Sequence, residues 1–104
     1  MKFALLSLTP RDKLIDVTQA ADKVWSSPPA GLKPFAHYAF LGIPFPGYFD
    51  PNMTPAMVLV EAESGEAIMA AIFPVAMAGC TMWCVPLAEL PLAGIAEVPK
   101  KLGG

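Results

Sequence analysis

The longest uncharged stretch of the chain constrains its fold more than any other feature. From Ala67 to Ala88, between Glu66 and Glu89, no side chain carries a charge. This run is long enough to span a bilayer, because about 20 apolar residues cover the ~30 Å hydrocarbon core. It also divides into a helix, a turn and a buried strand. The chain is therefore either a small membrane protein or a globular domain with an unusually apolar interior.

Residues within this run favour the globular alternative. Pro74 removes a backbone donor from its first half, and Gly79 stands where a helix commonly ends. The segment 80–85 is richer in strand-forming residues than the segment 67–72. Acidic residues flank the run, without the Lys/Arg cluster that orients a transmembrane span. We therefore predict a helix, a turn and a strand, and keep a membrane span at 67–88 as the less favoured alternative.

Size and composition predict one domain that associates with itself. A chain of 104 residues suits a single domain, and a monomer of this size buries only about two thirds of its unfolded surface. Yet 55% of the residues are hydrophobic and only 15% are charged. We expect a homodimer, or a larger homo-oligomer, to cover the surplus apolar surface. The net charge of −2 and the scattered lysines predict no nucleic-acid binding.

The two cysteines and the single histidine limit the chemistry. On one strand, Cys80 and Cys84 would lie ~13 Å apart at about 3.3 Å per residue, beyond the ~7 Å that a disulfide allows. We predict buried, reduced thiols in a cytoplasmic protein. Together with His37 they offer too few soft ligands for a zinc site. We therefore expect no metal, and we expect no cofactor either.

Hydrophobic periodicity predicts the order β-α-β-β-α-β. One helix is expected between Thr9 and Ser26, with Thr9 as its N-cap, and a second from Ser64, which Pro74 should kink or restart. A proline- and aromatic-rich loop is expected at 43–55, and a C-terminal tail at 91–104. The strands are expected at 1–8, 32–42, 56–61 and 80–87.

This order favours a ferredoxin-like α+β fold. Such a fold has two helices on one face of a four-stranded antiparallel sheet. The other face of the sheet would stay uncovered within the single domain, residues 1–104. On so apolar a chain, we expect that face to be buried against a second subunit.

Four short segments also carry a resemblance to known proteins: Met1–Phe3, Pro28–Lys33, Val60–Ala67 and Val85–Leu87. On these segments the chain resembles the dimeric α+β barrel superfamily, and within it a family of short uncharacterised prokaryotic proteins. The resemblance implies two sheets packed face to face and a pocket between sheet and helices in each subunit. It also implies cofactor-free oxygenase or isomerase chemistry as one use of that pocket. The loop 43–55 departs from the compact hairpin expected there.

Aromatic residues and the one histidine form the candidate site. A flat apolar molecule would suit such a pocket, with a tyrosine hydroxyl as its polar anchor and the loop 43–55 as its cover. Alternation on the second strand would place Phe35 and His37 on one face and Tyr38 on the other. The candidate ligand-binding residues are Phe35, His37, Tyr38, Tyr48 and Trp83.

The candidate catalytic residues are His37, Tyr38 and Asp50. His37 would serve as a general base tuned toward neutral pH. Each candidate has a plainer alternative: His37 as a histidine satisfied by one backbone partner, the aromatic residues as core and interface, and Asp50 as a turn initiator. The sequence leaves open whether the protein is an enzyme or a non-enzymatic oligomerisation or ligand-sensing module.

Overall fold

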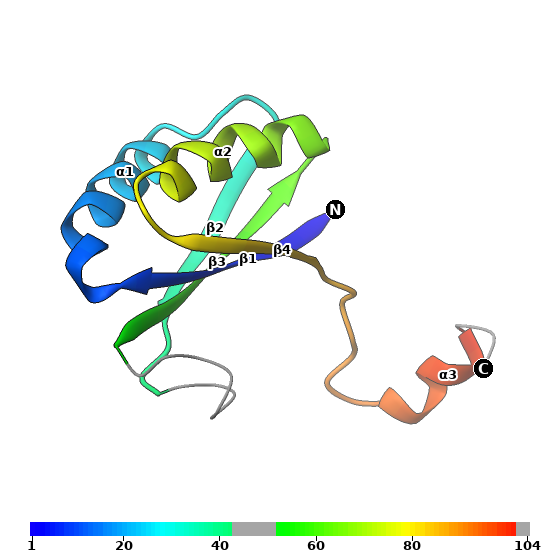
Figure 1. Cartoon of the computed structure of the whole chain (residues 1–104). Coiled ribbons are helices and arrows are strands. Elements are labelled where there is room, and N and C mark those ends of the chain that lie inside the picture. Colours follow the sequence, from blue (N-terminus) through cyan, green and yellow to red (C-terminus); the bar gives the residue numbers. More distant parts are fainter. Residues whose placement is uncertain (43–51, 102–104) are drawn as a thin grey trace.

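The computed structural model describes residues 1–42 and 52–101, and within this part the predicted β-α-β-β-α-β order is confirmed. The sheet is antiparallel throughout, with the strand order β2-β3-β1-β4. Helices α1 and α2 lie side by side on one face of it (Figure 1). The strands are β1 (Lys2–Pro10), β2 (Leu32–Ala39), β3 (Met53–Ala62) and β4 (Thr81–Pro86), and the helices are α1 (Leu14–Ser26), α2 (Gly65–Met77) and the short α3 (Val98–Lys101), with 3-10 turns η1 (Arg11–Lys13) and η2 (Ile95–Glu97).

The uncharged run divides as predicted into helix α2, a turn at Gly79 and strand β4. The Ser64 side chain caps α2, accepting a hydrogen bond of 3.2 Å from the Ala67 amide. Helix α2 passes through Pro74 without restarting. Pro74 cannot bond the Ala70 carbonyl, but both residues are exposed, so water can satisfy it. Among the described residues, no helix is both long enough and apolar enough to cross a membrane.

The start of α1 differs from the prediction. Strand β1 continues to Pro10, which lies opposite Met53, so Thr9 belongs to the sheet and does not cap the helix. The Thr9 side chain is buried and bonds the Cys80 thiol. The N-cap of α1 is Lys13, which makes no side-chain capping bond. The expected cap was wrong because pairing with β3 outweighs the local capping preference of threonine.

Strand β3 also begins earlier than predicted. Met53 to Pro55, expected in the loop, pair with the end of β1. Pro55 has no amide proton to donate, but its carbonyl accepts a bond of 3.1 Å from the Phe40 amide. The rest of the predicted loop, residues 43–51, lies outside the described residues.

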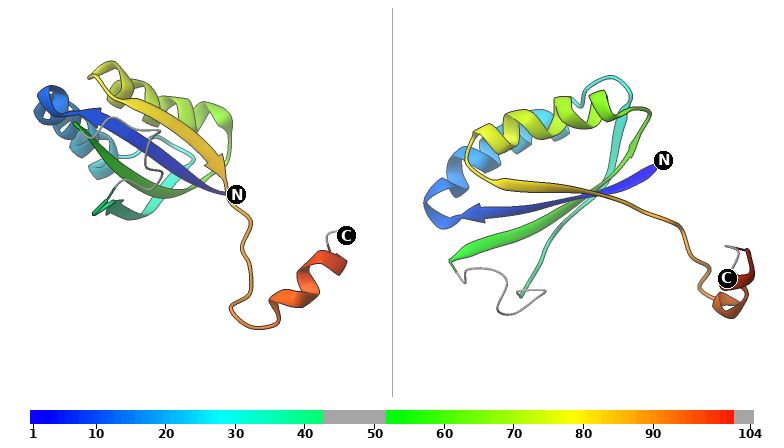
Figure 2. Two further views of the ribbon diagram at one scale, coloured as in Figure 1. Left: turned by 60° about the horizontal axis from the view of Figure 1, so that its bottom comes forward. Right: turned by 45° about the vertical axis from the view of Figure 1, so that its right-hand side comes forward.

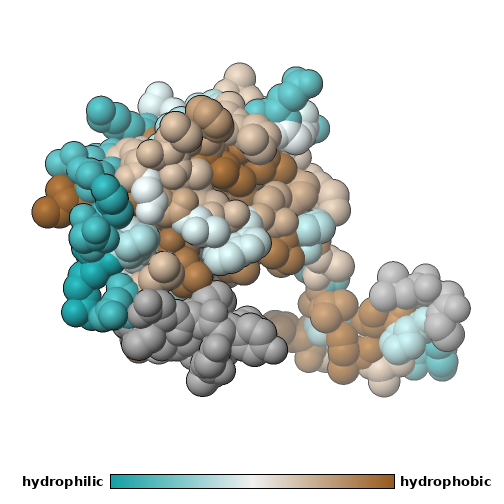
Figure 3. Space-filling model, in the orientation of Figure 1, coloured by the Kyte–Doolittle hydropathy of each residue, from teal (hydrophilic) through white to brown (hydrophobic). Residues whose placement is uncertain are grey.

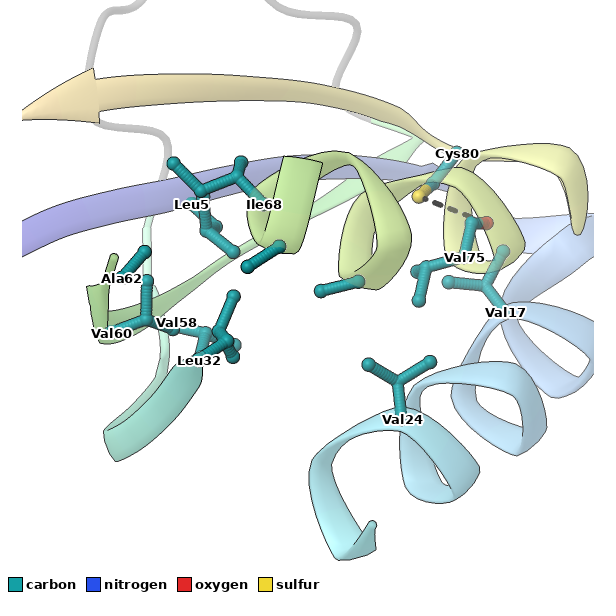
Figure 4. Close-up of a cluster of buried hydrophobic side chains, with 12 residues drawn as sticks. Leu5, Val17, Val24, Leu32, Val58, Val60, Ala62, Ile68, Val75 and Cys80 are labelled. Atoms are coloured by element: carbon teal, nitrogen blue, oxygen red, sulfur yellow. Dashed lines mark hydrogen bonds between the residues drawn. The ribbon is translucent and has the colours of Figure 1, made fainter. Parts of the chain in front are cut away.

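The hydrophobic core fills the space between the sheet and the two helices (Figure 4). At its centre Leu5, Val60 and Ala71 are almost completely buried. Helix α2 turns one face toward this core, because its buried positions recur at three- and four-residue intervals. The buried cluster comprises Leu5, Val17, Val24, Leu32, Val58, Val60, Ala62, Ala67, Ile68, Ala71, Val75 and Cys80.

The opposite face of the sheet, here called the open face, has no helix over it in any view of the described chain (Figures 1 and 2). Because side chains alternate along a strand, the open face carries the residues that lie between the core positions. The register places these residues in transverse rows across the strands, for example Ala36, Leu59, Ala4 and Val85.

Beyond β4 the chain forms a C-terminal arm, residues 87–101, that extends away from the sheet and helices. Both views in Figure 2 show η2 and α3 standing apart from the rest of the chain. The arm contains the single 3-10 turn η2 and the four-residue helix α3.

Candidate functional site

A β-bulge in β2 decides where the candidate residues on that strand point. The register between β2 and β3 shifts between Pro34 and Ala36, so one extra residue, Phe35, enters the strand. The Phe35 ring lies on the open face, where the Lys2 ammonium stands 5.6 Å from its centroid. His37 lies opposite Val58 and therefore on the core side. The prediction that Phe35 and His37 share a face was wrong, because the bulge reverses the alternation.

Two of the candidate aromatic residues belong to one row across the open face. Tyr38 lies opposite Met57, Met57 opposite Leu6, and Leu6 opposite Trp83. This aromatic row, Tyr38-Met57-Leu6-Trp83, crosses all four strands and has an aromatic residue at each edge. With strands about 4.8 Å apart, the two aromatic residues are separated by about 14 Å. The side chain of Tyr38 is 55% exposed and that of Trp83 is 42% exposed.

A charged row borders the apolar rows at one end of the open face. Lys33 lies opposite Glu61, and Glu61 lies opposite Lys2. The signs alternate along the row, an arrangement in which each charge has an opposite neighbour. The open face is thus apolar over most of its described length and polar at the end where β1 begins.

His37 is exposed on the edge strand β2 and faces away from Tyr38. Within one chain, His37 as a general base and the Tyr38 hydroxyl as a polar anchor therefore cannot line the same pocket. Tyr48 and Asp50 lie outside the described residues. Of the five predicted ligand-binding residues, the structure brings Phe35, Tyr38 and Trp83 onto one face.

The two cysteines differ in their surroundings. Cys80 is buried and donates a bond of 3.5 Å to the Val75 carbonyl. Burial raises the pKa of its thiol, while backbone and Thr9 hydrogen bonds act in the opposite direction. Cys84 is exposed, contrary to the prediction of two buried thiols, although partial desolvation also raises its pKa. Both thiols are free, and the described residues contain no group of three or more His, Cys, Asp or Glu side chains placed to hold a metal ion.

Two hollows on the surface lie away from the aromatic row. One, of about 620 Å³, runs between α1 and α2 beside Lys23 and Pro74. The other, of about 380 Å³, lies at the sheet end beside Gly31 and Glu61. Neither is lined by a candidate aromatic residue. The open face is therefore the surface on which those residues gather.

Comparison with known proteins assigns no family to the chain. No protein-family model matches it, and no curated protein matches it either. The structure itself defines the class: a small α+β protein with a four-stranded antiparallel sheet.

Leu6 and Met57 are parts of the site that sequence reasoning missed. They connect the two aromatic residues in the row, but only the strand register reveals this. The sequence carried a partial signal, since Leu6 is an apolar residue directly after the apolar Leu5 in β1, and alternation turns the two to opposite faces of the sheet.

Proposed function

We propose that the chain is a ferredoxin-like subunit of a homodimer that binds a small apolar or aromatic molecule on the open face of its sheet. The ferredoxin-like assignment is supported by the two helical crossovers and by β1 and β3 at the centre of the sheet. The site replaces the pocket between sheet and helices that the sequence suggested, because core side chains fill that space.

The observation that carries the proposal is the aromatic row. Tyr38 and Trp83 stand at opposite ends of a strip whose middle residues, Leu6 and Met57, are partly buried. Large exposed apolar patches of this kind usually mark binding surfaces. A flat ligand would lie over Leu6 and Met57, between the two rings, with the Tyr38 hydroxyl as its polar anchor.

A second copy of the chain supplies the other wall of this site. Packed sheets stand about 10 Å apart, a separation that side chains of both faces fill. Where small residues such as Ala4 and Ala36 lie beside the aromatic row, two such faces leave room for a ligand between them. Since His37 lies on the core side, we propose binding and not catalysis.

Binding of a flat fluorescent probe, anilinonaphthalene sulfonate, tests the proposal. We expect saturable binding to the dimer, with an affinity that falls about tenfold or more in Trp83→Leu and less in Tyr38→Phe. The reason is that Trp83→Leu removes a large apolar contact area, whereas Tyr38→Phe removes only a hydroxyl group. The matched control is Phe73→Leu, which removes an exposed aromatic ring from α2 on the other side of the molecule.

Light scattering on each variant separates loss of the ligand from loss of the dimer. A dimer that keeps full probe affinity after Trp83→Leu would contradict the site. A dimer that shows no saturable probe binding would favour the alternative function, a module that serves oligomerisation only.

A further inference from the structure

We propose that the C-terminal arm of one chain packs on a second copy of the chain, against the margin of the open face. This inference deepens the proposed homodimer and rests on it, since a second copy must be present to receive the arm. It concerns a different segment from the aromatic row, and the two can fail separately.

The arm leaves the sheet in a fixed direction. The Leu87 amide donates a bond of 2.9 Å to the Lys2 carbonyl, and Lys2 Nζ lies 3.6 Å from Glu89 Oε1. These two contacts hold the root of the arm beside the first residues of β1. Past them the chain continues off the end of the sheet, as Figures 1 and 2 show.

The arm carries apolar side chains that its own chain leaves exposed. Leu90 and Ile95 are about half exposed, and Leu92 is fully exposed. Two of the charged side chains beyond the root form an ion pair, Lys100 Nζ lying 3.3 Å from Glu97 Oε2. The surface of the arm is accordingly hydrophobic over most of its visible side (Figure 3). An unpartnered arm of this composition is typical of a segment that packs on another chain.

The size of the whole chain supports a second copy as the partner. Its radius of gyration is 15.5 Å, against about 13 Å for a compact chain of this length. It exposes 7165 Å², against about 5,600 Å² for a typical folded monomer of this mass. The difference, about 1,600 Å², exceeds the roughly 800 Å² that each partner buries in a standard interface. One copy thus has enough surplus surface for both a sheet contact and an arm contact.

The chain's own open face is a poorer destination for the arm. The contacts at Lys2 hold the root of the arm at the charged end of the sheet. Beyond them the chain runs off that end (Figures 1 and 2), so reaching its own aromatic row would require a reversal of the chain. In the proposed dimer the centre of that face is already covered by the second sheet. Exchange of arms between two copies buries both arms by one symmetric arrangement.

Sedimentation equilibrium of the full chain gives the first test. Leu92→Asp should raise the dimer dissociation constant about tenfold or more, because a charge would replace a buried leucine in each of two arms. The control is Ile15→Asp, at an exposed apolar position of α1 away from the sheet, which should leave the constant unchanged. If the wild-type chain is a dimer and Leu92→Asp leaves its dissociation constant unchanged, the arm contact alone is overturned. If the wild-type chain is a monomer, the proposed homodimer is overturned as well.

Paramagnetic broadening distinguishes a second copy from fold-back. One chain carries Cys84→Ser and a nitroxide attached at Leu92→Cys, and it has natural isotope content. It is mixed with wild-type chain that is enriched in ¹⁵N and carries no nitroxide. We expect broadened amide signals in edge strand β2 or β4 of the ¹⁵N chain, and none with the nitroxide at Met69→Cys on the exposed side of α2. If broadening occurred only when the same chain carried both the nitroxide and the ¹⁵N enrichment, the arm would fold back on its own chain and the proposal would be overturned. The absence of any broadening would overturn it too.

Discussion

Gly79 ends α2 with a backbone conformation that other residues rarely adopt. Its φ is +128°, and a Cβ placed on it would lie 2.9 Å from Lys13 Cγ. Only glycine enters this region without strain, so this one residue permits the turn from helix to strand within the uncharged run. Sequence reasoning could place the turn because the requirement is local.

Replacement of Gly79 by alanine should therefore destabilise the fold. We expect Gly79→Ala to lower the free energy of unfolding by about 1–3 kcal/mol, the usual cost of a strained backbone conformation. Gly65→Ala is the matched control, because a Cβ there meets no atom within 4 Å. Urea unfolding measures both variants, and equal midpoints for the two would contradict this account.

Elements with local signals were predictable, whereas their partners across the sheet were not. Helix α2 could be predicted from the sequence because its apolar positions follow the helical period and the N-cap residue Ser64 precedes them. The bulge at Phe35 and the extension of β1 through Thr9 and Pro10 arise from pairing with β3, distant in sequence. The faces on which Phe35 and His37 lie therefore could not be predicted without the strand register, and neither could the aromatic row.

The Ser64 cap provides a test at the level of one helix. Ser64→Ala should lower the free energy of unfolding by about 1 kcal/mol, because the Ala67 amide would lose its hydrogen-bond acceptor. Ser64→Asp should retain most of the stability, since its carboxylate can accept the same bond near the positive end of the helix. Thermal unfolding followed by circular dichroism compares the variants, and an equal loss of stability in both would show that the hydrogen-bond acceptor at this position is not what stabilises the helix.

At the scale of the whole molecule, the hydrophobic core and the proposed association surface lie on different sides of the sheet. The core that unites the sheet with α1 and α2 lies on one side, while the open face and the arm hold apolar residues that this core does not use. Leu6 marks the division, because it is a partly buried residue of the central strand β1 and lies opposite both Met57 and Trp83. A charge at this position should break association between open faces and leave the core intact.

Leu6→Lys should thus convert a particle of about twice the 11.0 kDa chain mass into one of a single chain. Its ammonium would be desolvated between two apolar sheets in the dimer but hydrated in the monomer. Light scattering gives the mass, while circular dichroism and cooperative unfolding report whether the fold survives. Ile15→Lys, on the exposed side of α1, should leave the mass unchanged. A folded Leu6→Lys dimer would place the interface elsewhere, and an unfolded chain would show that Leu6 belongs to the core.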